Sequence, residues 1–251
     1  MIPNIVHFVY INERPWRLHH YLSVKSASRL NPQKINIWLD KEPEGEWWEA
    51  TKPLVNLNFV TPPTEIFGTP ITQPAHKSDV IRLQVLLEYG GIYADTDVIF
   101  TKSFDNILNN KFVLGQQGLN GGEGLCPAVI LSEINSTFGQ QWLRGFKEYF
   151  KGGPPGSDTW CTHSVYYPLL LSKKIPNEIT ILNHEAFFWP LYHKEHIEIL
   201  LRKNQTFPNA YAHHLWESCC ILDGEKYLDT LTKNDILHSN TTFTNIVKDL
   251  L

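Results

Sequence analysis

The first hundred residues alternate between two spacings of apolar side chains. Short β-branched and aromatic runs predict buried strands, whereas longer segments whose apolar residues recur every three or four positions predict helices. The predicted strands cover residues 4–10, 35–39, 55–60, 92–94 and 98–100, and the predicted helices cover residues 16–30, 47–54 and 75–89. Because strands and helices follow one another in turn, the pattern predicts an α/β fold with a parallel sheet covered by helices.

The second half of the chain is less regular. Its apolar runs predict strands at residues 127–131 and 179–182, helices at residues 137–150 and 161–171, and a strand or loop at residues 210–216. No internal repeat and no linker divides the chain. We therefore expect a single domain over residues 1–251.

Charge and hydropathy narrow the classes of function. The 251 residues carry 22 Lys and Arg against 26 Asp and Glu, a net charge of −4, so the basic excess that binds a phosphate backbone is missing and no nucleic-acid partner is expected. No apolar stretch approaches the roughly 18 residues that span a membrane, and the first residues do not resemble a secretory signal. We expect a cytoplasmic protein with no transmembrane segment. The oligomeric state does not follow from the sequence.

Two aspartates follow the predicted strand at residues 92–94. Asp95 and Asp97 lie at its carboxyl end, which is where open α/β sheets bind their ligands. In a turn, the two carboxylates can converge on one hard cation such as Mn²⁺ or Mg²⁺. Alone, the spacing is weak evidence, because a chain of this length contains roughly one Asp-x-Asp by chance. The alternative is a solvated turn.

The residues before the aspartates strengthen the interpretation. Within residues 77–97 the chain reads Lys-Ser-Asp-x-x-Arg and then Tyr-Gly-Gly-Ile-Tyr-x-Asp-x-Asp. This stretch resembles the sugar-binding, Asp-x-Asp-containing region of glycosyltransferase family thirty-two, which includes initiating α-1,6-mannosyltransferases and α-1,4-galactosyltransferases. It is also similar to the glucosyltransferase domains of large bacterial toxins. Residues 2–10, 181–190 and 211–216 resemble further segments of the family.

The resemblance implies a fold and an activity. The fold is the GT-A type of nucleotide-diphospho-sugar transferase, a mixed, mainly parallel sheet flanked by helices. The activity is metal-dependent, retaining transfer of a hexose from a UDP- or GDP-sugar to a hydroxyl of a glycan or other acceptor. Residues 1–100 would form the part that binds the nucleotide sugar. Residues 101–251 would form the acceptor side and a C-terminal segment that closes over metal and donor.

The resemblance also implies roles for single residues. Asp97 would bind Mn²⁺ or Mg²⁺ directly, and Asp95 would hold the ribose and the metal. Asp79 and Arg82 would contact the transferred sugar, since their i,i+3 spacing places both on one helix face. Further contacts with the nucleotide-sugar donor are expected from Val9, Tyr10, Ser78 and Tyr93.

Several of these assignments have a structural alternative. Asp79 and Arg82 could form an ordinary surface salt bridge, and Tyr93 could be a buried strand aromatic. His214 is the favoured third metal ligand, but strand register decides whether His214 or His213 faces the site. Water or Glu217 could complete the metal shell instead.

Two other functions use the same residues. A nucleotidyltransferase or phosphodiesterase could employ the same pair of aspartates, and it would release pyrophosphate or a nucleoside monophosphate. A carbohydrate- or nucleotide-binding module without turnover is the second alternative. The intact set of Asp79, Arg82, Asp95 and Asp97 argues against that module.

Overall fold

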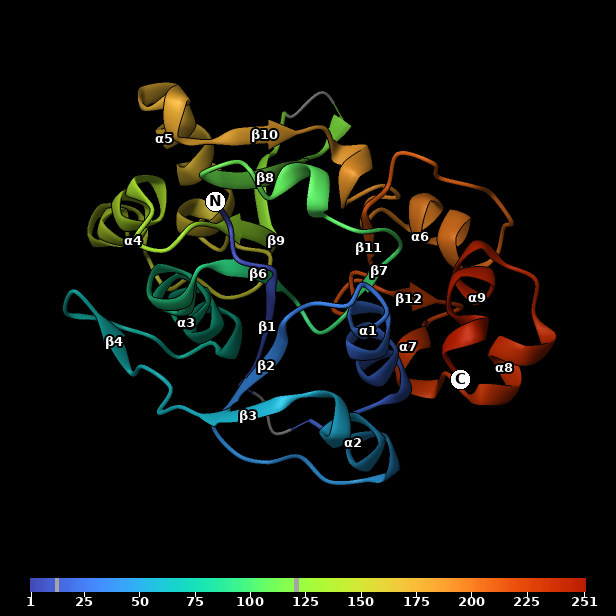
Figure 1. Ribbon diagram of the computed structural model, residues 1–251. Coiled ribbons are helices and arrows are strands. Elements are labelled where there is room, and N and C mark those ends of the chain that lie inside the picture. Colours follow the sequence, from blue (N-terminus) through green and yellow to red (C-terminus); the bar gives the residue numbers. More distant parts are fainter. Residues whose placement is uncertain (12–13, 120–121) are drawn as a thin grey trace.

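A computed structural model describes residues 1–11, 14–119 and 122–251 of the protein. Its centre is a seven-stranded sheet in the order β10-β8-β9-β6-β1-β2-β3 (Figure 1). In this sheet β9 runs antiparallel to β6 and β8, and the other neighbouring strands are parallel, so the sheet is mixed and mainly parallel. Its strands are β1 (Ile5–Tyr10), β2 (Lys34–Leu39), β3 (Asn56–Phe59), β6 (Gly91–Ala94), β8 (Phe112–Gln117), β9 (Gly124–Ser132) and β10 (Thr180–Leu182).

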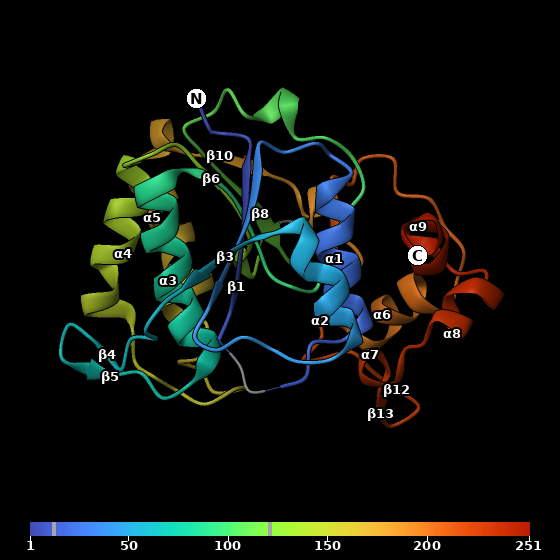
Figure 2. The same cartoon turned by 60° about the horizontal axis from the view of Figure 1, so that its bottom comes forward.

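Helices cover both faces of the sheet. Figure 2 shows α3 and α4 on one side of it and α1 and α2 on the other. Each side buries its own apolar cluster: Phe138 and Trp142 of α4 belong to one, and Val24 and Ala27 of α1 belong to the other. The bounds are α1 (Leu18–Ser28), α2 (Glu46–Thr51), α3 (Pro74–Tyr89), α4 (Thr137–Tyr149) and α5 (Tyr167–Lys174).

The C-terminal third packs beside α1 rather than on the sheet (Figure 1). Leu18 and Leu22 of α1 share a third apolar cluster with residues of this part, among them Leu200 and Ile236. Its elements are α6 (Lys194–Leu201), β11 (Ala212–His214), β12 (Ile221–Leu222), β13 (Glu225–Lys226), α7 (Tyr227–Thr230), α8 (Lys233–His238) and α9 (Thr242–Val247). The sequence pattern gave no prediction for residues 217–251.

A pair of glycines connects α3 directly to β6. Gly90 ends the helix with φ +63°, and Gly91 begins the strand with φ +105°, both in the left-handed region that glycine favours. A Cβ on Gly91 would lie 2.5 Å from the carbonyl oxygen of Ile5. This close approach lets β6 pair with β1 at once, so Asp95 follows the helix after only one short strand.

The predicted elements of the first hundred residues are confirmed, and the differences are one added hairpin there and several changes in the second half of the chain. β8 was not predicted, although it forms part of the sheet next to β9. The expected helix at residues 161–171 divides into a π-helical turn, η4 (Thr162–Tyr166), and α5, which extends to Lys174. The Pro-rich loop after β3 contains the hairpin of β4 (Glu65–Ile66) and β5 (Thr69–Pro70). Among the residues that the structure describes, no helix has the length and apolar character needed to cross a bilayer.

Candidate active site

The two aspartates lie in a tight turn where the chain leaves the main sheet. The backbone N–H of Asp95 donates to the carbonyl oxygen of Ala128 in β9 at 2.9 Å, and the N–H of Val98 donates to the carbonyl oxygen of Asp95 at 3.1 Å. β7 (Val98–Phe100) then pairs antiparallel with β11. The carboxyl end of β6 therefore carries Asp95 and Asp97 on a backbone that is fixed from both sides.

The pairing of β7 with β11 brings a histidine to the aspartates. His214 pairs with Val98, and the N–H of Leu215 donates to the carbonyl oxygen of Asp97 at 2.9 Å. His214 Nε2 lies 3.2 Å from Asp97 Oδ2. One ligand atom from each of Asp95, Asp97 and His214 lies within 4.8 Å of the others. The structure thus places the three predicted metal ligands together, which we call the Asp-Asp-His group.

The neighbouring histidine points elsewhere. His213 is buried, its Nδ1 lies 2.9 Å from the carbonyl oxygen of Trp189, and burial lowers its pKa. Successive side chains of a strand face opposite sides. The register of β11 consequently puts His214, and not His213, beside the aspartates.

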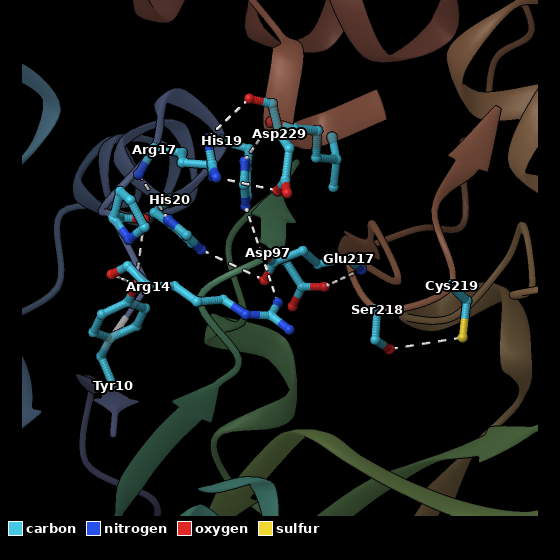
Figure 3. A network of polar contacts seen from close by, with 12 residues as sticks. Tyr10, Arg14, Arg17, His19, His20, Asp97, Glu217, Ser218, Cys219 and Asp229 are labelled. Atoms are coloured by element: carbon cyan, nitrogen blue, oxygen red, sulfur yellow. Dashed lines mark hydrogen bonds and ion pairs between the residues drawn. The ribbon is translucent and has the colours of Figure 1, made fainter. Parts of the chain in front are cut away.

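Glu217 touches the site with its backbone only. Its N–H donates to Asp97 Oδ2 at 2.8 Å. Its carboxylate lies with three other side chains, 3.6 Å from His19 Nε2, 3.5 Å from His20 Nε2 and 3.7 Å from an Arg14 nitrogen (Figure 3). The Glu217 side chain therefore belongs to a second group, formed with His19 and His20, and not to the Asp-Asp-His group.

Burial and charge oppose each other within the Asp-Asp-His group. Burial alone would raise the pKa of Asp97, but the His214 imidazole outweighs it and the pKa of Asp97 is lowered. Burial would lower the pKa of His214, and the Asp97 carboxylate reverses this effect and raises it. Burial raises the pKa of Asp95, Arg82 opposes that rise and Asp97 adds to it. Two carboxylates, one partly buried and one buried, face one imidazole and concentrate negative charge, which favours a bound cation.

Asp79 and Arg82 form an ion pair inside the protein. Their exposed fractions are 6% and 5%, so the salt bridge expected as the alternative exists, but it is buried and not on the surface. Arg82 NH2 lies 3.3 Å from Asp79 Oδ1 and 3.4 Å from Asp95 Oδ1. Arg82 NH1 donates to the carbonyl oxygen of Pro127 at 2.9 Å, and its guanidinium stacks 4.5 Å from the centre of the Tyr93 ring. Arg82 thus links the α3 pair to the aspartate turn.

The other residues predicted to contact the nucleotide-sugar donor differ in burial and in their hydrogen bonds. Tyr93 is a buried strand aromatic whose hydroxyl donates to Asp95 Oδ1. Ser78 contributes its carbonyl oxygen, which accepts from Arg82 Nε at 3.3 Å. Val9 and Tyr10 are buried in β1, and the Tyr10 hydroxyl donates to the carbonyl oxygen of Arg14 at 2.7 Å. The donor contacts of these four residues stay predictions.

Sequence reasoning missed three histidines near the site. His163 Nε2 lies 2.9 Å from Asp79 Oδ2, although 84 positions separate the two residues. His19 and His20 lie in the predicted helix at residues 16–30, where no spacing marked them. A long sequence separation and a helix without a motif offer no signal to a single-sequence analysis.

Comparisons with known proteins agree on one class of enzyme. The profile of the family described as "Glycosyltransferase sugar-binding region containing DXD motif" matches residues 19–113. Glucan organizing enzyme 1 of Cryptococcus neoformans is 33% identical over 272 residues, covering 100% of this chain and 71% of that protein. Lactosylceramide 4-alpha-galactosyltransferase of Rattus norvegicus is 29% identical over 154 residues, covering 55% of this chain and 40% of that protein.

Solved structures share the fold at low identity. The apo form of the glycosyltransferase GlyE of Streptococcus pneumoniae has a TM-score of 0.53 at 14% identity, covering 98% of this chain and 62% of that one. The PaToxG glycosyltransferase has a TM-score of 0.50 at 17% identity, covering 70% of both chains. Together with the mixed sheet, these likenesses confirm the predicted GT-A type fold.

Proposed function

The chain belongs to the family of glycosyltransferases whose sugar-binding region contains an Asp-x-Asp motif, and from that premise we propose that it is a metal-dependent, retaining hexosyltransferase. It moves a hexose from a UDP- or GDP-sugar to a hydroxyl group of a glycan or other acceptor. The observation that carries the proposal is the Asp-Asp-His group beside the buried ion pair of Asp79 and Arg82.

The chemistry of the Asp-Asp-His group fits a divalent cation. Asp95 and Asp97 offer the oxygen ligands that Mn²⁺ and Mg²⁺ prefer, and a neutral imidazole at His214 suits Mn²⁺ better than Mg²⁺. Such an ion, when bound, neutralises the charge that develops on a diphosphate leaving group. The surrounding burial strengthens this electrostatic effect, because nearby charges are less screened than in water.

The residues of α3 would hold the sugar. Asp79 accepts hydrogen bonds from sugar hydroxyls, and Arg82 donates to hydroxyl or phosphate oxygens. In the transfer, the bond between the anomeric carbon and the diphosphate oxygen breaks, and its electron pair leaves with the nucleoside diphosphate. The acceptor oxygen bonds to the anomeric carbon and passes its proton to the leaving diphosphate. Positioning and charge stabilisation are what this chain's residues contribute.

The acceptor class and the stereochemistry rest on the family. The rat relative is named for galactosyl transfer to lactosylceramide, which supports a glycan hydroxyl as acceptor. Retention at the anomeric carbon follows the family resemblance of residues 77–97. The anomeric configuration of the product, measured by NMR, tests it directly.

The experiment that tests the proposal is a screen of nucleotide sugars. UDP- and GDP-hexoses are incubated with the protein and Mn²⁺ or Mg²⁺, and the release of nucleoside diphosphate is measured with and without a chelator. We expect release from one donor class that stops on chelation. Release of pyrophosphate or nucleoside monophosphate would instead indicate a nucleotidyltransferase or phosphodiesterase. Tight binding without any release would indicate a binding module.

A further inference from the structure

His163 contacts Asp79 from the side opposite Arg82. Its Nε2 lies 2.9 Å from Asp79 Oδ2, whereas Arg82 faces Oδ1 at 3.3 Å. We propose that His163 is a positioning residue that holds the Asp79 carboxylate in the orientation that recognises the donor sugar. The inference rests on the proposed function, because it requires that Asp79 contacts the sugar.

The surroundings of the His163 ring determine where its proton lies. The ring is fully buried, and its Nδ1 has no hydrogen-bond partner among the described residues. The rings of His76, Phe146 and Phe150 surround it edge-on, with centroids 4.8, 4.9 and 4.9 Å away. A neutral imidazole carries one N–H, and only Nε2 has an acceptor. The proton is therefore assigned to Nε2 and donated to Asp79.

The unpaired nitrogen makes His163 a costly residue at this position. A buried polar atom without a partner lowers stability, and such atoms are rare in folded proteins. An apolar ring would fill the same aromatic cage without this penalty. The contact that an apolar ring could not supply is the hydrogen bond to Asp79.

The backbone around His163 is also fixed. His163 lies in the π-helical turn η4, a conformation that is frequent at functional sites. Its carbonyl oxygen accepts a hydrogen bond from Trp142 Nε1 at 2.8 Å. Held at both its ring and its backbone, the His163 side chain has no polar partner other than Asp79 in the part of the chain that the structure describes.

The hydrogen bond from His163 also affects how Arg82 is shared. Arg82 NH2 lies 3.3 Å from Asp79 Oδ1 and 3.4 Å from Asp95 Oδ1, so it is divided almost evenly between the two carboxylates. His163 satisfies the far oxygen of Asp79. Without that hydrogen bond, Asp79 would attract Arg82 more strongly and draw it away from Asp95.

A metal ion bound by His163 is the competing explanation. His76, Asp79 and His163 lie close enough together to ligate one. Two histidines and one carboxylate are typical ligands of tetrahedral Zn²⁺. However, the 2.9 Å between His163 Nε2 and Asp79 Oδ2 is a hydrogen-bond length, shorter than the roughly 3.3 Å between two ligands of such an ion with bonds of about 2.0 Å. In addition, His76 Nε2 lies 3.3 Å from the carbonyl oxygen of Trp160. The geometry favours a direct hydrogen bond.

The test measures two affinities for each variant. One is for the nucleotide sugar that the screen identifies as the donor, and the other is for the nucleoside diphosphate of that donor. His163→Leu removes the hydrogen bond, and we expect it to weaken nucleotide-sugar binding tenfold or more and nucleoside diphosphate binding less than twofold. His163→Gln places an amide N–H near the position of Nε2 and should restore the wild-type ratio. His163→Asn is too short to reach Asp79 and should behave like His163→Leu.

His76→Leu is the matched control. His76 is also buried and lies in the same cage, but the hydrogen bond of its Nε2 is to the carbonyl oxygen of Trp160 and not to Asp79. Its loss therefore tests packing without removing the hydrogen bond to Asp79, and thermal unfolding is measured for every variant. Equal weakening of both ligands in His163→Leu, or the same change of ratio in His76→Leu, would overturn the inference. So would a metal ion in the purified protein that His163→Gln loses. If the wild-type protein binds and cleaves no nucleotide sugar, the proposed function itself fails.

Discussion

Two groups of carboxylates and histidines lie side by side in this protein, and they differ in how their charges are balanced. In the group of His19, His20 and Glu217, one carboxylate faces two imidazoles and a nearby Arg14 guanidinium. In the Asp-Asp-His group, two carboxylates face one imidazole, and one of them, Asp95, shares Arg82 with Asp79. The first group is balanced by the chain itself. The second keeps an excess of negative charge, which a cation would neutralise.

The two groups also differ in the hydrogen bonds that determine which histidine nitrogen carries the proton. His20 Nδ1 accepts from the backbone N–H of Arg17 at 2.9 Å, so the neutral ring carries its proton on Nε2, the nitrogen that faces Glu217. A protonated nitrogen cannot bind a metal. His214 Nε2 also faces a carboxylate, that of Asp97 at 3.2 Å, but no backbone N–H fixes its Nδ1 among the described residues, so its proton can move to Nδ1 and leave Nε2 to a cation. Proximity of residue types therefore identifies both groups, but only charge balance and tautomer distinguish between them.

The largest expected effect is the loss of turnover on changing the aspartates. Asp97→Asn and Asp95→Asn each remove an oxygen ligand and a charge, so release of nucleoside diphosphate should fall at least about a hundredfold while the fold persists. Glu217→Gln is the control, because it changes a carboxylate of the balanced group; it should leave the Mn²⁺ concentration for half-maximal activity unchanged. Undiminished transfer by Asp97→Asn in chelator-treated buffer would contradict the metal site.

The next effect concerns recognition of the sugar. Asp79→Ala should weaken nucleotide-sugar binding about tenfold to a hundredfold and free-nucleotide binding far less, since a buried polar contact contributes roughly 1–3 kcal/mol. Isothermal titration with both ligands measures the difference. Equal losses for both ligands would make the buried pair of Asp79 and Arg82 a purely structural ion pair.

A smaller effect should appear at the C-terminal histidines. His214→Ala removes the imidazole from the Asp-Asp-His group, so the Mn²⁺ concentration for half-maximal activity should rise about tenfold. His213→Ala should have a milder effect, because its ring faces Trp189. A larger metal effect in His213→Ala would show that the register assigned to β11 is wrong, and no effect in either variant would indicate that water completes the shell.

The smallest effect is a pH dependence in the balanced group. Burial, more than the neighbouring His19, lowers the pKa of His20 from 6.5 to about 4, so the folded protein keeps this ring neutral where the unfolded chain protonates it. Stability is therefore fully present above pH 6.5 and falls as the pH drops towards 4. Between pH 7 and pH 5, the protonation of His20 in the unfolded chain lowers the free energy of unfolding by about 2 kcal/mol. Urea denaturation of the wild type and His20→Gln should show a shallower fall in the variant, and parallel curves would refute this assignment.

The sequence allowed the prediction of those parts of the fold that local patterns determine. Alternating strands and helices over the first hundred residues, and the turn that carries Asp95 and Asp97, follow from apolar spacing and glycine positions. β8 was not predicted because the strand contains Gly115 and ends in two glutamines. These residues weaken the apolar pattern of a buried strand. The small helices after residue 217 are too short for a periodicity to emerge.

The site was predictable where a motif exists and not where only tertiary contacts exist. The sequence could name His214 as a candidate metal ligand but left its register open until the pairing of β11 with β7 placed it. His163 reaches Asp79 from a π-helical turn, a conformation that no pattern in the sequence indicated. The position of Arg82 between two carboxylates, 3.3 Å from one and 3.4 Å from the other, is set by the tertiary structure. Sequence spacing does not encode it.

The pairing of β11 with β7 has a consequence for how the protein forms. About 110 residues separate the two strands, and closing so long a loop costs entropy that must be offset by contacts made late in folding. A nascent chain that has emerged as far as residue 113 holds the whole sugar-binding motif, yet it lacks the third ligand. If the Asp-Asp-His group binds a cation as proposed, the site is complete only when the C-terminal part docks, and a bound cation would in turn stabilise the docked state.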